Sequence, residues 1–116
     1  MHLGLGRVLL SLSDYAAALA AFDDAARLGE ISGEFHALRG ETLMRLQRYR
    51  DAVVAYRQAL RTNVENVTWR LNLGISLAAS GPDGRTEAER RFREVLAMDS
   101  ANTRAWEELH DLGARF

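Results

Sequence analysis

The chain repeats itself with a period of about 34 residues, and this period constrains its fold more than any other feature. In each copy a glycine is followed by an alanine and then by an aromatic residue. The three sets are Gly6, Ala18 and Phe22; Gly40, Ala52 and Tyr56; and Gly74, Ala88 and Phe92. Self-similarity at a period of roughly 20–50 residues indicates stacked supersecondary units rather than a single-core globule.

The sizes of the repeated residues suggest how each unit packs. Small side chains let two helix backbones approach closely, and the aromatic residue fills the space one turn further on. The spacing from the glycine to the alanine is the same in the first two copies, and it is two positions longer in the third. The two extra residues fall in the turn-forming run Gly81-Pro82-Asp83-Gly84. We therefore expect a longer turn there between two helices that stay in register.

The composition suits helices, because alanine and leucine are abundant and the chain contains one proline. Gly29 and Asn63 follow the second and fourth predicted helices as C-terminal caps. The pattern predicts seven helices, at about 2–12, 15–28, 34–46, 49–61, 67–80, 85–97 and 102–114.

The repeated residues resemble the tetratricopeptide repeat (TPR) family, although Glu30, Val64 and Ser100 stand where that family favours proline. The residues that carry the resemblance are Leu5, Gly6, Leu12, Asp14, Tyr15, Ala18, Phe22, Ala25, Gly40, Leu43, Leu46, Tyr49, Ala52, Tyr56, Ala59, Leu73, Gly74, Leu77, Ala88 and Phe92. The resemblance implies an all-α, right-handed superhelical solenoid of three helix pairs plus a C-terminal capping helix. We expect a single domain over 1–116, with repeats at about 1–32, 33–66 and 67–102 and the capping helix at 103–116.

The resemblance also implies that the first helices of successive pairs line a concave groove. The residues that we expect in the groove are Leu3, Arg7, Leu10, Ala37, Leu38, Glu41, Met44, Leu71, Asn72 and Ile75, with Glu34, Arg45, Thr68, Arg104 and Glu108 beside them. They form an apolar strip dotted with charges of both signs, which favours a peptide or a helix of a partner protein as the ligand. The alternative is that tight curvature buries several of these side chains against neighbouring helices.

One ligand of this family can be tested on the sequence. TPR domains that grip the acidic C-terminal tails of the large heat-shock chaperones use a cluster of Lys, Arg and Asn side chains. The positions in phase with that cluster are Leu3, Arg7, Leu38, Thr68 and Asn72. One of the five is basic and two are leucines, so a terminal carboxylate pair would lack donors. We do not expect this ligand.

Residues that could support catalysis or bind a metal are sparse. The run Gly74-Ile75-Ser76-Leu77-Ala78 begins like a nucleophile elbow, but it lacks the final glycine and lies within a predicted helix. His2 and His36 are one repeat period apart and could share a metal only with a third ligand; helix packing explains them better. We therefore expect no enzymatic activity, no metal and no cofactor.

The charge and the hydropathy also limit the partners. A formal net charge of −1 gives no general attraction to nucleic acid. The arginines of 85–93 alternate with glutamates, which is typical of a solvated helix face with ion pairs along it. No apolar run approaches the roughly 20 residues of a membrane span, and we identify no signal peptide, which favours the cytoplasm over the periplasm. All fifteen basic residues are arginine, a usage associated with GC-rich bacterial genomes.

The sequence thus predicts a non-enzymatic protein–protein interaction module, either a scaffold or an assembly chaperone. Two alternatives stay open. The chain begins abruptly in its first repeat, so it could be a recruiting or regulatory domain of a larger enzyme. It could also form a homodimer through Leu3, Val8 and Leu10 of its first helix.

Overall fold

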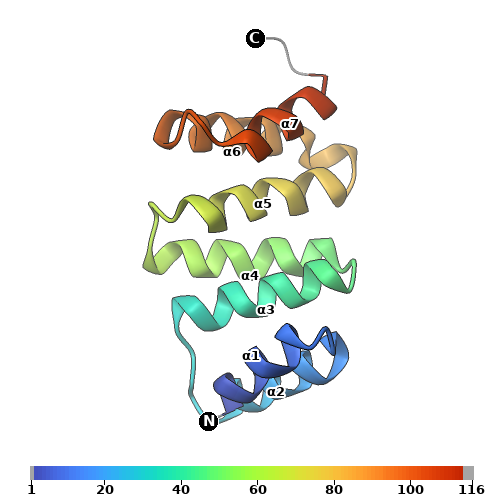
Figure 1. Cartoon of the computed structure of the whole chain (residues 1–116), viewed down its shortest axis with the longest axis vertical. Coiled ribbons are helices and arrows are strands. Elements are labelled where there is room, and N and C mark those ends of the chain that lie inside the picture. Colours follow the sequence, from blue (N-terminus) through green and yellow to red (C-terminus); the bar gives the residue numbers. More distant parts are fainter. Residues whose placement is uncertain (1, 114–116) are drawn as a thin grey trace.

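The structure is a computed structural model that describes residues 2–113. Within that range it contains seven α-helices and one short 3₁₀ turn (Figure 1). The elements are α1 (His2–Ser11), α2 (Tyr15–Arg27), α3 (Gly33–Arg45), α4 (Tyr49–Thr62), α5 (Val67–Ala79), η1 (Pro82–Gly84), α6 (Arg85–Met98) and α7 (Thr103–Asp111). The first six helices begin and end within a residue of their predicted bounds. The predicted capping helix is shorter than expected, and its residues 114–116 lie outside the described range.

The helices form a stack that rises from the N-terminus to the C-terminus (Figure 1). Pairs of consecutive helices pack together as α1 with α2, α3 with α4, and α5 with α6, and α7 packs on α6. The stack measures 45 Å along its long axis and 24 by 23 Å across it. No helix in the described part of the chain is long and apolar enough to cross a membrane. The all-α solenoid expected from the repeat is confirmed.

Local capping explains where several helices begin and end. The side chain at the N-cap accepts a hydrogen bond from the backbone N–H three residues on in four helices, at Asp14, Ser32, Asn66 and Asn102. The predicted C-terminal glycine of α2 is also observed: Gly29 has φ +76°, a left-handed conformation that glycine adopts without strain. The turn predicted at 81–84 lies between α5 and α6 and forms η1.

The repeated glycine and aromatic residue face each other within each pair. A Cβ on Gly40 would lie 2.9 Å from Cε2 of Tyr56, and one on Gly74 would lie 2.6 Å from Cε1 of Phe92. Gly6 meets the ring of Phe22 in the same way. The three rings are at most 1% exposed. These contacts set how closely the two helices of a pair approach, as the residue sizes predicted.

The buried side chains form two separate clusters. The smaller cluster consists of Ala18, Phe22 and Ala25 of α2 and Phe35 at the start of α3, and leucines of α1 pack against it. Its two rings meet edge to face, with centroids 6.4 Å apart. The larger cluster extends from α3 to α7 and includes Leu43, Tyr56, Leu73, Phe92 and Leu109. Leu3 and Leu10 of α1 pack against the smaller cluster, so of the three residues expected at a dimer face only Val8 is largely exposed, at 54%.

A chain of ion pairs joins α4, α5 and α6. Arg57 of α4 donates two hydrogen bonds to the carboxylate of Glu87, at 2.9 and 2.7 Å. The chain continues through Arg91, Glu94 and Arg70, with N···O distances of 3.2, 3.0 and 3.3 Å. The predicted pairing of arginines with glutamates along α6 is therefore observed.

The first prediction tests the contact between glycine and the aromatic ring. We expect Gly40→Ala to lower the free energy of unfolding by about 1–2 kcal/mol, because the overpacking against Tyr56 outweighs the higher helix propensity of alanine. Gly4→Ala is the matched control, since a Cβ on Gly4 meets nothing within 4 Å. The control should stabilise the fold by up to about 1 kcal/mol. Denaturant melts that show the same sign for both variants would contradict the assignment.

The second prediction concerns acid sensitivity. The hydrogen bonds from Arg57, followed by the attraction of Arg57 and Arg91, hold the pKa of Glu87 below its ordinary value of 4.5. A lowered pKa stabilises the fold above the ordinary pKa, and this contribution is lost as the pH falls through the lower folded-state pKa. We expect Glu87→Gln to cost about 1 kcal/mol at pH 7 and progressively less as the pH falls below 4.5. A cost that is independent of pH in urea melts would exclude the ion pair as its source.

Candidate peptide-binding groove

Three adjoining hollows run along the face formed by α1, α3, α5 and α7. Hollow A, of about 410 Å³, is lined by Arg7, Leu10, Ser11, Ser13, Tyr15, Leu38, Glu41 and Arg45. Hollow B, of about 330 Å³, is lined by Glu41, Met44, Arg45, Tyr49, Asn72, Ile75 and Arg104. Hollow C, of about 340 Å³, is lined by Glu34, Ala37, Leu38, Glu41, Tyr56, Thr68, Trp69 and Asn72. Together they form a continuous polar and apolar groove.

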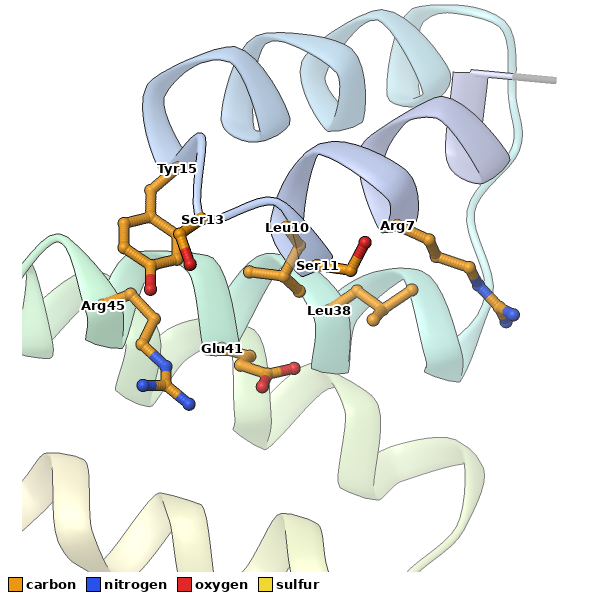
Figure 2. A pocket seen from close by; sticks show the side chains of 8 residues that line it. All are labelled: Arg7, Leu10, Ser11, Ser13, Tyr15, Leu38, Glu41 and Arg45. Atoms are coloured by element: carbon orange, nitrogen blue, oxygen red, sulfur yellow. The ribbon is translucent and has the colours of Figure 1, made fainter.

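Helix α3 forms the centre of this groove. Its residues at 38, 41 and 45 are spaced by three and four positions, so they lie on one face of the helix. Glu41 lines all three hollows, and Leu38 and Arg45 line two each. In hollow A the side chains of α3 face those of α1 and of the turn before α2 (Figure 2). A ligand in any of the hollows would therefore contact α3.

The structure brings eight of the ten predicted groove residues into these hollows. They are Arg7, Leu10, Ala37, Leu38, Glu41, Met44, Asn72 and Ile75. Leu3 and Leu71 do not line any of the three; Leu3 packs partly buried against the smaller core cluster and Leu71 against the larger one. Ala37 is itself part of the core, with 8% of its surface exposed. The role of these residues in binding stays a prediction.

The apolar side chains in the groove contribute more to packing than the sequence indicated. Leu10 and Leu38 are half-buried against the smaller cluster, and Met44 and Ile75 against the larger one. This partial burial against neighbouring helices agrees with the alternative interpretation of the sequence. The groups left open to a ligand are therefore more polar than an apolar strip.

Two tyrosines in the groove were not predicted. Tyr15 lines hollow A and Tyr49 lines hollow B, and each is the first residue of the second helix in its pair. Figure 2 shows the ring of Tyr15 beside Arg45 at one end of hollow A. The two tyrosines are one repeat period apart, so the period could have identified them as equivalent groove residues. The prediction considered the first helices alone and therefore omitted them.

Several polar groups of the groove already have partners. Arg7 of α1 pairs with Glu34 of α3, and Arg104 pairs with Glu108 within α7 at 2.7 Å. Asn72 donates a hydrogen bond to the hydroxyl of Tyr56, with an N···O distance of 3.2 Å. Burial raises the pKa of Tyr56, so this phenol stays neutral throughout the physiological range.

Two charges in the groove have no such partner. Among residues 2–113, neither Glu41 nor Arg45 forms an ion pair. The Glu41 side chain is half-buried and that of Arg45 is exposed. Both are available to a ligand without the loss of an existing ion pair.

The other residues considered for chemistry lie apart from the groove hollows. Ser76 is fully buried within α5, and its Oγ has no hydrogen-bond partner among the described residues. His36 lies edge to face with Phe35, with ring centroids 5.1 Å apart. Burial, followed by repulsion from Arg39, lowers the pKa of His36. Within the described residues, no three His, Cys, Asp or Glu side chains are grouped so that they could hold a metal ion.

Comparison with known proteins identifies the repeat. A family model described as tetratricopeptide repeat matches residues 1–35 and 37–81. No curated protein sequence matches the chain. Among solved structures, the second TPR domain of human RPAP3, in complex with an HSP70 peptide, is similar with a TM-score of 0.85 and 18% identity, covering 98% of this chain and 93% of that one.

Two further structures show the same likeness. The first TPR of Spaghetti (RPAP3), bound to an HSP90 peptide, has a TM-score of 0.86 and 17% identity, covering 97% of this chain and 87% of that one. The type III secretion chaperone SycD of Yersinia enterocolitica, in complex with a peptide of the translocator YopD, has a TM-score of 0.82 and 14% identity, covering 97% and 89%. At these identities the likeness establishes the fold.

The third prediction separates packing from recognition in the groove. We expect Ile75→Glu to lower the free energy of unfolding by about 1–3 kcal/mol, because it places a carboxylate against the larger core cluster. Arg45→Glu, at an exposed position, should change it by no more than about 0.5 kcal/mol. Thermal melts in which both variants are equally stable would show that Ile75 is a free surface residue. Charged groove positions are thus the appropriate sites for binding tests.

Proposed function

Because the chain belongs to the tetratricopeptide repeat family, we propose that it is a non-enzymatic protein–protein interaction module that binds a peptide or helix of a partner protein in its concave groove. The observation that carries this proposal is the set of three adjoining hollows that meet at Glu41. Concave sites with a few converging polar groups are where ligands bind on folds of this size. A role as a scaffold or an assembly chaperone for the partner follows from such binding.

The structural neighbours support this function by analogy. Two of them were determined with heat-shock protein peptides and one with a peptide of a secretion translocator. Their stacks have the same form as this one, so a groove of the same kind is available here. The whole of residues 1–116 would act as one binding domain with repeats at about 1–32, 33–66 and 67–102.

The proposed partner differs from a heat-shock protein tail. Of the five positions in phase with the clamp of basic and amide side chains, Leu3 packs against the smaller core cluster and Leu38 places an aliphatic side chain in hollows A and C. Arg7 is held by Glu34. A terminal carboxylate would find no set of free donors at these positions. We therefore propose an internal segment of the partner as the ligand.

The fourth prediction tests the groove by obstruction. We would select peptides from a displayed library on the wild-type protein and then measure their affinity for two variants. Thr68→Trp places a bulky ring in hollow C, whereas Thr86→Trp places it on α6 away from the hollows. Each threonine is exposed and is the second residue of its helix, so the two changes are matched.

We expect the selected peptides to bind Thr68→Trp about tenfold more weakly than wild type and to bind Thr86→Trp unchanged. Equal affinities for all three proteins would place the binding site outside the groove. A selection that yields no binding peptide would contradict the proposed function itself.

A further inference from the structure

The charges of the groove are arranged unevenly along α3. The charged residues of hollow C are both acidic, Glu34 and Glu41. Hollows A and B each add arginines: Arg45 lines both, together with Arg7 in hollow A and Arg104 in hollow B. The groove therefore becomes more positive from hollow C toward Arg45.

Existing ion pairs neutralise most of these charges. Glu34 engages Arg7, and Glu108 engages Arg104. What remains within the described residues is one carboxylate and one guanidinium, Glu41 and Arg45, four residues apart on α3. If a ligand covers both charged groups and pairs with neither, the two groups lose hydration without a new contact that offsets this cost. A ligand that pairs with both gains two charge-assisted contacts.

From this arrangement we infer that Glu41 and Arg45 select an extended partner segment that carries one basic and one acidic side chain two residues apart. The basic side chain faces Glu41, and the acidic one faces Arg45. Residues four apart on a helix are separated by about 6 Å along its axis. Hollows C and B follow one another along α3, because C is lined by its residues between 34 and 41 and B by those between 41 and 45, so a segment that occupies both hollows runs along this helix. Side chains on the same face of an extended segment repeat every two residues, or about 6.6 Å, which matches this spacing. This inference rests on the proposed function, because it specifies the ligand of the same groove.

The shape and chemistry of the hollows favour an extended segment. Three hollows of about 330–410 Å³ each can take single side chains, and extended peptides are commonly recognised by pockets for alternate residues. Near Arg45, the phenols of Tyr15 and Tyr49 line the same hollows (Figure 2 shows Tyr15). A phenol hydroxyl can donate to a carboxylate, so the acidic side chain of the segment has donors besides the guanidinium.

The fifth prediction uses the pool of peptides selected from a displayed library of seven-residue segments. The pool on the wild-type protein should be enriched in opposite charges separated by one residue, with one order preferred over the other. On the double variant Glu41→Arg with Arg45→Glu, the preferred order should reverse. Each selected peptide should lose about tenfold in affinity when it is moved to the variant, because two attractive contacts become repulsive.

A second double variant controls for the charge changes alone. Arg61→Glu with Glu65→Arg reverses two exposed charges that are also four residues apart and lie outside the hollows. It should leave both the pool and the affinities unchanged.

A pool without paired opposite charges, or one that is the same on the wild type and the groove variant, would overturn the inference but leave the proposed function standing. Enrichment of charges four residues apart would show a helical ligand and overturn the extended segment. An empty pool would contradict both proposals.

Discussion

The close contact between a glycine and an aromatic ring inside each helix pair is the constraint on which the rest of the structure depends. At Gly40 and Gly74 there is no room for a Cβ, because the rings of Tyr56 and Phe92 occupy the space. The first and second helices of a pair are thereby held at one separation and rotation. Repetition of this contact once in every period turns the same face of each first helix toward the groove. Packing inside the pairs is thus one of the conditions for the groove, and the stacking of the pairs completes its lining.

The same reasoning explains why the fold could be predicted from the sequence. The residues that set the period are small or aromatic and almost fully buried, so their spacing reports directly on packing. The longer turn of the third copy was also predictable, since its two extra residues fall in a Gly-Pro-Asp-Gly run that the structure shows as η1. Gly29 at the end of α2 followed from the same local chemistry.

The groove was less predictable, because its lining depends on how the pairs rotate relative to one another. Leu3 and Leu71 line none of the three hollows, and the period of the sequence alone does not separate them from the predicted groove residues that do. Tyr15 and Tyr49 reach the groove from second helices. Their spacing of one period indicates that they are equivalent, but only the stacked structure shows that they line the groove. The apolar residues in the groove are shared between core and surface, so polar side chains carry more of its chemistry than the sequence suggested.

The division of the core into two clusters has a consequence for cooperativity. In a stack whose units contact only their neighbours, stability is a sum of local terms, and one end can open while the remainder stays folded. Helix α2 contacts both clusters: Phe22 and Ala25 belong to the smaller one, and Leu19 packs against the larger one. Hollow A needs both α1 and α3, whereas hollows B and C are built from α3 to α7 alone. Local unfolding of the first pair would therefore remove hollow A and leave Glu41 and Arg45 in place on a shorter stack that is still folded.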